Sequence, residues 1–228
     1  TTLAQQLKPS AVDFDSLHRN YHPMLELVKT LIGVIPNCDP LLEIWPIGFR
    51  TYNLLVPNCL NLPFSLFGLG APKPLIGLAM YSSSRVAACA YCSAHTFAFA
   101  LRRGIRPASL TGHRTLREEI VVTVAEGMAR VPSDLTTSQC VALTEHFSTE
   151  DIEWIVLSVG LMGFLNKCMD ALGVELESDS INEVGALLIP TGWNPGQHAD
   201  SNVKIPHESV LPDADNLGTY FRVLRQVP

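Results

Sequence analysis

Two cysteines and a histidine recur at intervals of three residues in the run Cys89-Ala-Tyr-Cys92-Ser-Ala-His95. On a helix, each step of three residues turns the chain by about 300°, so the three side chains would span about 120° of one face. Cys89 and Cys92 could then form a disulfide after local backbone adjustment, and His95 could reach Cys92 directly or through one water. A nearby imidazole and a place in the first helical turn both lower the pKa of a thiol. The spacing therefore favours dithiol chemistry.

Two other interpretations of this pair remain open. A structural zinc site usually has four ligands, often with a second cysteine pair at matched spacing, and no second CxxC pair accompanies Cys89 and Cys92. Cysteine is also among the most buried residue types, so both could be core residues without a redox role. We place dithiol chemistry ahead of both, and we expect no metal and no cofactor.

The segment 84–96 resembles the active-site segment of alkylhydroperoxidase D-like members of the carboxymuconolactone decarboxylase superfamily. Segments 118–130 and 164–175 are similar to the helices that close the domain in the larger members of that superfamily. The Gly-Trp…Gly-Gln-His tail at 192–198 is similar to that of some members. The resemblance covers about residues 65 to 200.

This resemblance implies an all-α bundle that forms dimers, trimers or hexamers. It also implies thiol-dependent peroxide reduction. In that scheme Cys92 attacks the peroxide as a thiolate, and its sulfenic acid condenses with Cys89 to a disulfide. His95 relays the proton, and an external dithiol restores the reduced state.

Two departures from the family pattern concern the proton relay. The histidine follows the second cysteine by three residues instead of the four in the family founder. A family glutamate is also missing, because Pro74 stands at its place at the start of the run 74–79, and no carboxylate lies between Pro74 and Cys89. The substitutes that we considered are Glu118, Glu119, Tyr81 and Ser84.

Composition sets limits on the partners of this chain. Charged residues make up 17% of its 228 residues and hydrophobic residues 47%, whereas about 25% charged is typical of soluble domains. We interpret the difference as apolar surface hidden between copies of the chain, in a homo-oligomer. The net charge of −6 and the lack of a basic stripe argue against nucleic acid.

We also expect no membrane partner and a cytoplasmic location. The apolar run 154–165 is shorter than the roughly 18 residues that a spanning helix needs. The first fifteen residues lack the basic-then-apolar layout of a signal peptide. In that compartment the six cysteines should be mostly reduced.

Helix signals occur along most of the chain, and no region alternates with period two. Capping-box pairs, in which a threonine and a residue three positions later bond each other's backbone, stand at Thr115 with Glu118 and at Thr136 with Gln139. Further helices are expected from Pro23, over about 75–85, through the cysteines to 103, and from Ser148 to Gly173, with a break at Pro46. We predict a single all-α domain over 1–228, with an irregular segment at 1–22 and a C-terminal arm at 178–228. That arm carries one short helix near 220–225.

Two other functions stay open. The first is a decarboxylase or other proton-transfer enzyme that acts on a small carboxylate or lactone, with His95 as general acid or base. The second is a redox-sensing or scaffolding oligomer. Of the other histidines, we expect His18 and His22 to cap the following helix and His198 to help the arm pin a neighbouring subunit.

Overall fold

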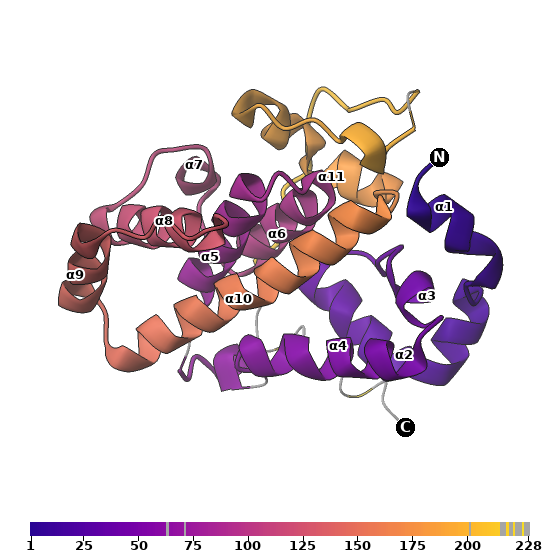
Figure 1. Cartoon of the computed structure of the whole chain (residues 1–228), viewed down its shortest axis with the longest axis horizontal. Coiled ribbons are helices and arrows are strands. Elements are labelled where there is room, and N and C mark those ends of the chain that lie inside the picture. Colours follow the sequence, from indigo (N-terminus) through magenta and orange to yellow (C-terminus); the bar gives the residue numbers. More distant parts are fainter. Residues whose placement is uncertain are drawn as a thin grey trace.

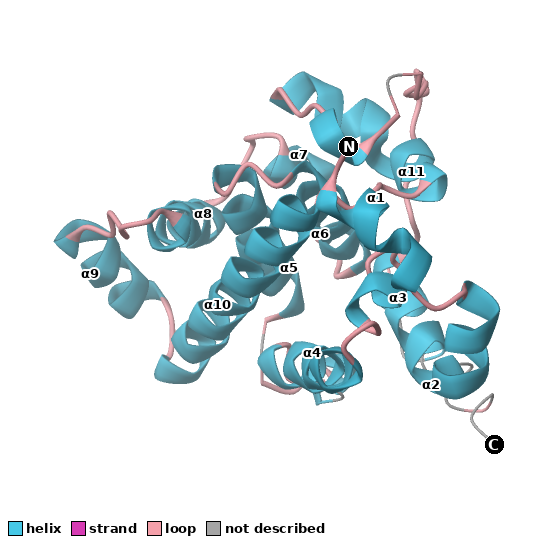
Figure 2. Cartoon of the chain, turned by 45° about the vertical axis from the view of Figure 1, so that its right-hand side comes forward, coloured by secondary structure: helices cyan, strands magenta, loops and turns pink. Residues whose placement is uncertain are grey.

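The computed structural model describes residues 1–62, 64–70, 72–200 and 202–214, together with Gly218, Phe221 and Arg225. These residues form helices and loops, with no strand in any of the described segments, which confirms the all-α prediction (Figure 2). The short helix expected near 220–225 falls largely outside them. The α-helices are α1 (Leu3–Leu7), α2 (Phe14–Ile32), α3 (Asp39–Leu42), α4 (Pro46–Cys59), α5 (Lys73–Val86), α6 (Ala90–Arg102), α7 (Pro107–Leu110), α8 (Leu116–Ala129), α9 (Thr137–His146), α10 (Thr149–Leu172) and α11 (Ser178–Leu188).

The main core lies where α5, α6, α8 and α10 pack together, and α11 covers α6 from the other side. Figure 1 shows α10 crossing the molecule diagonally, with α4 beside it. The closest approach joins α5 and α6. A Cβ atom added to Gly77 would lie only 2.7 Å from the Cα atom of Ala100, so the absence of a side chain at Gly77 permits this packing. Helix α6, which carries Cys92, is thus held against α5.

The N-terminal segment 1–22 is helical, so the prediction of an irregular segment is wrong. Thr2 forms a capping box at the start of α1, and Asp13 caps α2 by accepting a hydrogen bond from the amide of Ser16 at 2.7 Å. Pro23 lies inside α2 instead of starting it. A proline ring clashes with the preceding turn, and the chain accommodates it by a kink at Tyr21, whose φ is −134° and ψ 20°.

The expected arm at 178–228 begins with a helix, which is a second correction. Helix α11 buries Ile181, Val184 and Leu188, and this spacing of three and four residues produces one apolar face. That face packs on α6. The sequence does not predict this helix, because its apolar pattern is short and prolines and glycines are frequent in the residues that follow.

The local signals in the second half of the chain are confirmed. Both predicted capping boxes are present, at Thr115 and at Thr136. Ser148 caps α10. That helix ends at Gly173, whose φ of 63° is a left-handed conformation that glycine adopts at low cost. Pro46 separates α3 from α4, as expected.

Helix α10 extends beyond the apolar run 154–165. With 24 residues it is long and apolar enough to cross a membrane by length and composition, and 39% of its most apolar window is buried. The core helix of a soluble protein meets the same criteria. The expectation that this region is too short is therefore wrong, although one such helix is weak evidence for a membrane.

Candidate active site around Cys89, Cys92 and His95

The turn between α5 and α6 places the two cysteines. Ala88 has a φ of 55°, a left-handed conformation that costs a residue with a Cβ roughly 1 kcal/mol. Cys89 follows as the N-cap of α6, and its sulfur accepts a hydrogen bond from the amide of Cys92 at 3.4 Å. A sulfur at this position lies at the positive end of the helix, where negative charge is stabilised.

The two thiols differ in how readily they ionise. Hydrogen bonds from the thiol and from the amide of Cys92 lower the pKa of Cys89. They outweigh burial, which alone would raise it. Burial raises the pKa of Cys92 well above its ordinary value. The hydrogen bond that Cys92 donates to Cys89 and the negative charge of Cys89 raise it further. The structure therefore favours a thiolate on Cys89 that accepts a hydrogen bond from Cys92. This order is the reverse of the one expected from the family scheme.

His95 is held by a carboxylate that we did not identify from the sequence. Its Nε2 atom lies 2.7 Å from Oε2 of Glu177, and both side chains are 10% exposed. Burial alone would raise the pKa of Glu177, but the charge and hydrogen bond of His95 hold it below its ordinary value. Glu177 is the N-cap residue of α11, so this helix brings a carboxylate to the imidazole from 82 residues further along the chain.

Glu177 also binds three other groups. Its Oε1 atom accepts hydrogen bonds from the Tyr91 hydroxyl at 3.0 Å and from the Asn37 amide at 2.6 Å, and its Oε2 atom accepts one from Ser180 at 3.3 Å. The ring of Tyr91 packs edge to face against that of His95, with centroids 4.4 Å apart. These contacts fix both the carboxylate and the imidazole.

None of the four substitutes considered for the missing glutamate is bonded to His95. Glu118 closes its capping box and accepts hydrogen bonds from Ser109 and Arg106. Ser84 donates to the carbonyl of Met80. The remaining two make other contacts: Glu119 pairs with Arg114, and Tyr81 packs on Phe97.

A small apolar cavity of about 90 Å³ lies beside this site. Cys92 and His95 line it, and Cys89 does not. Its polar lining also includes Cys38, Tyr52, Tyr91 and Thr96. The apolar lining consists of Val28, Leu31, Ile32, Pro36, Val56, Leu60, Met80, Phe99, Leu161, Met162, Leu165 and Met169. A substrate in the cavity would therefore meet the Cys92 sulfur and the imidazole, with Cys89 behind them.

Cys38 on the cavity wall leads to a second buried acid. Its thiol donates to Oδ1 of Asp39 at 3.7 Å. Asp39 is fully buried, and burial raises its pKa to about 7. Its Oδ2 atom has no hydrogen-bond partner within the described ranges. We did not single out either residue from the sequence.

The tail at 192–198 braces the site from within the same chain. The indole Nε1 of Trp193 donates to the carbonyl of Ala90 at 3.0 Å, in the first turn of α6. His198 Nδ1 lies 2.7 Å from the Val174 carbonyl oxygen, which ties the tail to the loop before α11. These contacts give the tail a role inside its own subunit, whereas we expected it to pin a neighbour.

No match was found among protein-family models or among curated proteins. Solved structures do match. Apo Bmp8, a debrominase, is 19% identical over 73% of this chain and 90% of its own, with a TM-score of 0.64. A cysteine-to-alanine variant of Bmp8 in complex with 2,3,4-tribromopyrrole is 19% identical over 79% of this chain and 95% of its own, with a TM-score of 0.67. An alkylhydroperoxidase D core, a peroxidase-related protein from Ralstonia eutropha JMP134, is 17% identical over 75% of this chain and 92% of its own, with a TM-score of 0.62. The chain therefore has the alkylhydroperoxidase D-like fold.

Proposed function

We propose that this protein is a thiol-dependent oxidoreductase of the alkylhydroperoxidase type, which reduces a small organic hydroperoxide. One observation carries the proposal: Cys92 and His95 line the same apolar cavity, while Cys89 is hydrogen-bonded to Cys92 from behind. The peroxidase-related neighbour supports the same class of reaction.

The reaction begins with the proton that the two sulfurs share. When Cys89 takes the proton of Cys92, the thiolate moves to the sulfur that faces the cavity. This thiolate attacks the terminal oxygen of the hydroperoxide. A sulfur–oxygen bond forms, the oxygen–oxygen bond breaks, and the alkoxide takes a proton from His95 to leave as an alcohol. Glu177 stabilises the imidazolium before that transfer.

The second half of the reaction closes the dithiol. The Cys89 sulfur attacks the sulfenic acid on Cys92, a disulfide forms, and water leaves. An external dithiol carrier then reduces the disulfide by thiol exchange. Because the cavity is largely apolar, an alkyl hydroperoxide should bind better than hydrogen peroxide.

Peroxide consumption with a dithiol reductant tests this proposal. We expect turnover of tert-butyl hydroperoxide at a higher kcat/KM than hydrogen peroxide, and at least about a hundredfold loss in Cys92→Ser. Cys140→Ser is the matched control, since Cys140 is an exposed thiol on α9 and its loss should change nothing. Full activity in Cys92→Ser would refute the proposal.

Proton transfer on a small carboxylate or lactone is a second candidate. The hydrogen-bonded set of His95, Glu177 and Tyr91 favours it, because this arrangement needs neither thiol to position a general acid or base. Turnover that survives in the Cys89→Ser, Cys92→Ser double variant and disappears in His95→Ala would select this function over the first.

A further inference from the structure

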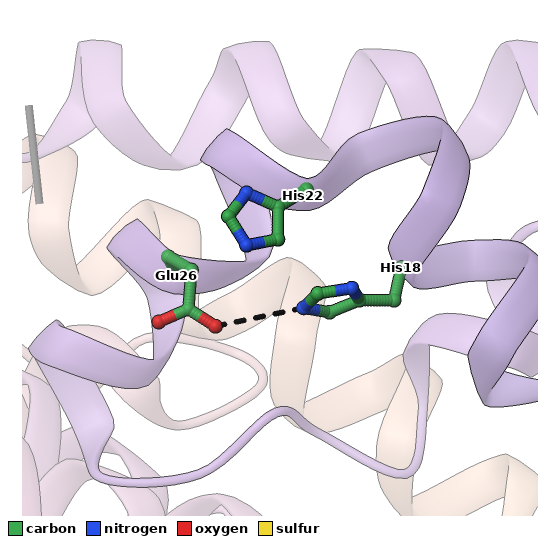
Figure 3. A group of neighbouring side chains, drawn as sticks. All are labelled: His18, His22 and Glu26. Atoms are coloured by element: carbon green, nitrogen blue, oxygen red, sulfur yellow. Dashed lines mark ion pairs between the residues drawn. The ribbon is translucent and has the colours of Figure 1, made fainter. Parts of the chain in front are cut away.

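Three side chains that commonly ligate metals meet on α2, away from the cavity described above. They are His18, His22 and Glu26, and their nearest ligand atoms all lie within 4.8 Å of one another (Figure 3). The Nε2 atom of His18 lies 3.6 Å from Oε1 of Glu26. The two imidazole rings stand edge to face, with centroids 4.4 Å apart.

The kink in α2 contributes to this meeting. His18 and Glu26 are eight residues apart, which corresponds to about 12 Å along a straight helix. The non-helical residue Tyr21 lies between His18 and His22 and bends the helix there. The bend is anchored, because the Tyr21 ring packs edge to face on Phe49 of α4, with centroids 4.9 Å apart. The packing of Tyr21 therefore fixes the backbone that carries the three donors.

The donor set and its spacing suit a tetrahedral ion. Zinc bonds imidazole nitrogen and carboxylate oxygen at about 2.0–2.2 Å, which places neighbouring ligand atoms about 3.3 Å apart. The distance of 3.6 Å between His18 and Glu26 is already close to that value. Two histidines and one carboxylate leave a fourth position for water, and the side chains of His18 and Glu26 are 44% and 25% exposed, so an ion can enter from solvent.

The imidazole of His22 is the third donor, and it is available. Among the described residues, it has no hydrogen-bond partner and contacts the ring of His18 by its edge. A nitrogen lone pair beside a carboxylate and a second imidazole is the environment that Zn²⁺, Ni²⁺ and Cu²⁺ prefer over Mg²⁺ or Ca²⁺, which bind mainly through oxygen.

We infer that His18, His22 and Glu26 form a site for a divalent transition-metal ion such as Zn²⁺, which clamps the bend of α2. The site differs from our sequence-based expectation of no metal, and it does not depend on the proposed thiol chemistry. A bound ion would join the two halves of α2. The second half contributes Val28, Leu31 and Ile32 to the cavity wall.

Metal titration of the Cys89→Ser, Cys92→Ser double variant tests the site without competition from the dithiol. We expect one Zn²⁺ per chain by calorimetry and a melting temperature that rises with zinc concentration. Co²⁺ should give the visible bands of nitrogen and oxygen ligands, without a thiolate charge-transfer band.

Two single variants in the same background locate the ion. His22→Ala and Glu26→Gln should each weaken binding at least tenfold while leaving the metal-free melting temperature within about 2 °C. His113→Ala is the matched control, because His113 is an exposed histidine elsewhere, and it should leave binding unchanged. Absence of binding, a thiolate band, or an affinity in either His22→Ala or Glu26→Gln that equals that of the parent double variant would overturn the inference.

Discussion

At the scale of single residues, Glu177 holds the imidazole of His95, which we propose acts as an acid or base. Replacing it by glutamine keeps the shape of the side chain and removes the negative charge. Glu177→Gln should lower kcat/KM for the hydroperoxide by roughly ten- to a hundredfold, a part of what a positioned acid or base contributes. Glu175→Gln, a change at a nearby exposed glutamate, is the control. Equal activity of the two variants would show that His95 works without a carboxylate.

The sulfur pair makes a second prediction at this scale. Cys89 and Cys92 should lose their protons in two separate steps, one at a pH below the ordinary pKa of a cysteine thiol and one well above it. Thiolate absorbance of the native chain, minus that of the Cys89→Ser, Cys92→Ser double variant, measures both steps. In Cys92→Ala the first step should shift upward, because Cys89 loses the hydrogen bond from the Cys92 thiol. An unshifted first step would mean that Cys92 does not stabilise the thiolate.

The sequence predicted the residues of this site only where they share one helix. Spacing predicts that Cys89, Cys92 and His95 lie on one face, and in the structure Cys92 and His95 line the cavity while Cys89 stands at the N-cap of α6, outside it. Glu177 gave no signal because it stands 82 residues beyond His95, just before a helix that we did not predict. His18 and His22 are separated by one helical turn, but that spacing carries no information in a segment expected to be irregular.

At the scale of elements, the same contrast holds between local and tertiary signals. The caps at Thr115, Thr136 and Gly173 were predictable because each depends on a few neighbouring residues. The kink at Tyr21 was not, because it depends on a compromise between the ring of Pro23 and the packing of Tyr21 on Phe49. Helix caps that depend on neighbouring residues are therefore predicted more reliably than a kink that depends on tertiary packing.

The contact between α5 and α6 gives the prediction at this scale. Gly77→Ala would place a Cβ atom 2.7 Å from the backbone of Ala100, so we expect a loss of about 1–3 kcal/mol in the free energy of unfolding. Gly160→Ala is the matched control, because a Cβ atom there meets nothing within 4 Å and should stabilise α10 by about 0.5–1 kcal/mol. Urea denaturation of both variants measures the difference, and a neutral Gly77→Ala would contradict the close packing.

At the scale of the whole molecule, Asp39 makes stability depend on pH. Its pKa is about 7 in the folded chain and 3.8 as its ordinary value. As the pH rises, the unfolded chain therefore loses the proton of Asp39 at a lower pH than the folded chain does. The contribution of Asp39 to stability is fully present below pH 3.8 and declines until about pH 7. Asp39→Asn should be more stable than the native chain at pH 8, by up to about 4 kcal/mol, and the difference should shrink toward pH 4. A difference that is constant with pH would refute a raised pKa.

The predicted homo-oligomer also belongs to this scale. Apolar side chains are exposed on two adjacent helices, with Ile47 and Leu54 on α4 and Val156 and Phe164 on α10. We propose that a second copy of the chain covers them. Phe164→Glu should then lower the mass measured by sedimentation, whereas Leu116→Glu, a change at an exposed leucine at the start of α8, should not. A native chain that sediments as a monomer would end this proposal.

The hydrogen bond from the Trp193 indole to the Ala90 carbonyl attaches a fluorophore to the backbone between the two sulfurs. Closing a Cys89–Cys92 bridge must adjust that backbone, so the emission of Trp193 should follow the redox state in real time, without any added dye. Because Trp45 and Trp154 also emit, the redox signal of Trp193 is the difference between the native chain and Trp193→Phe.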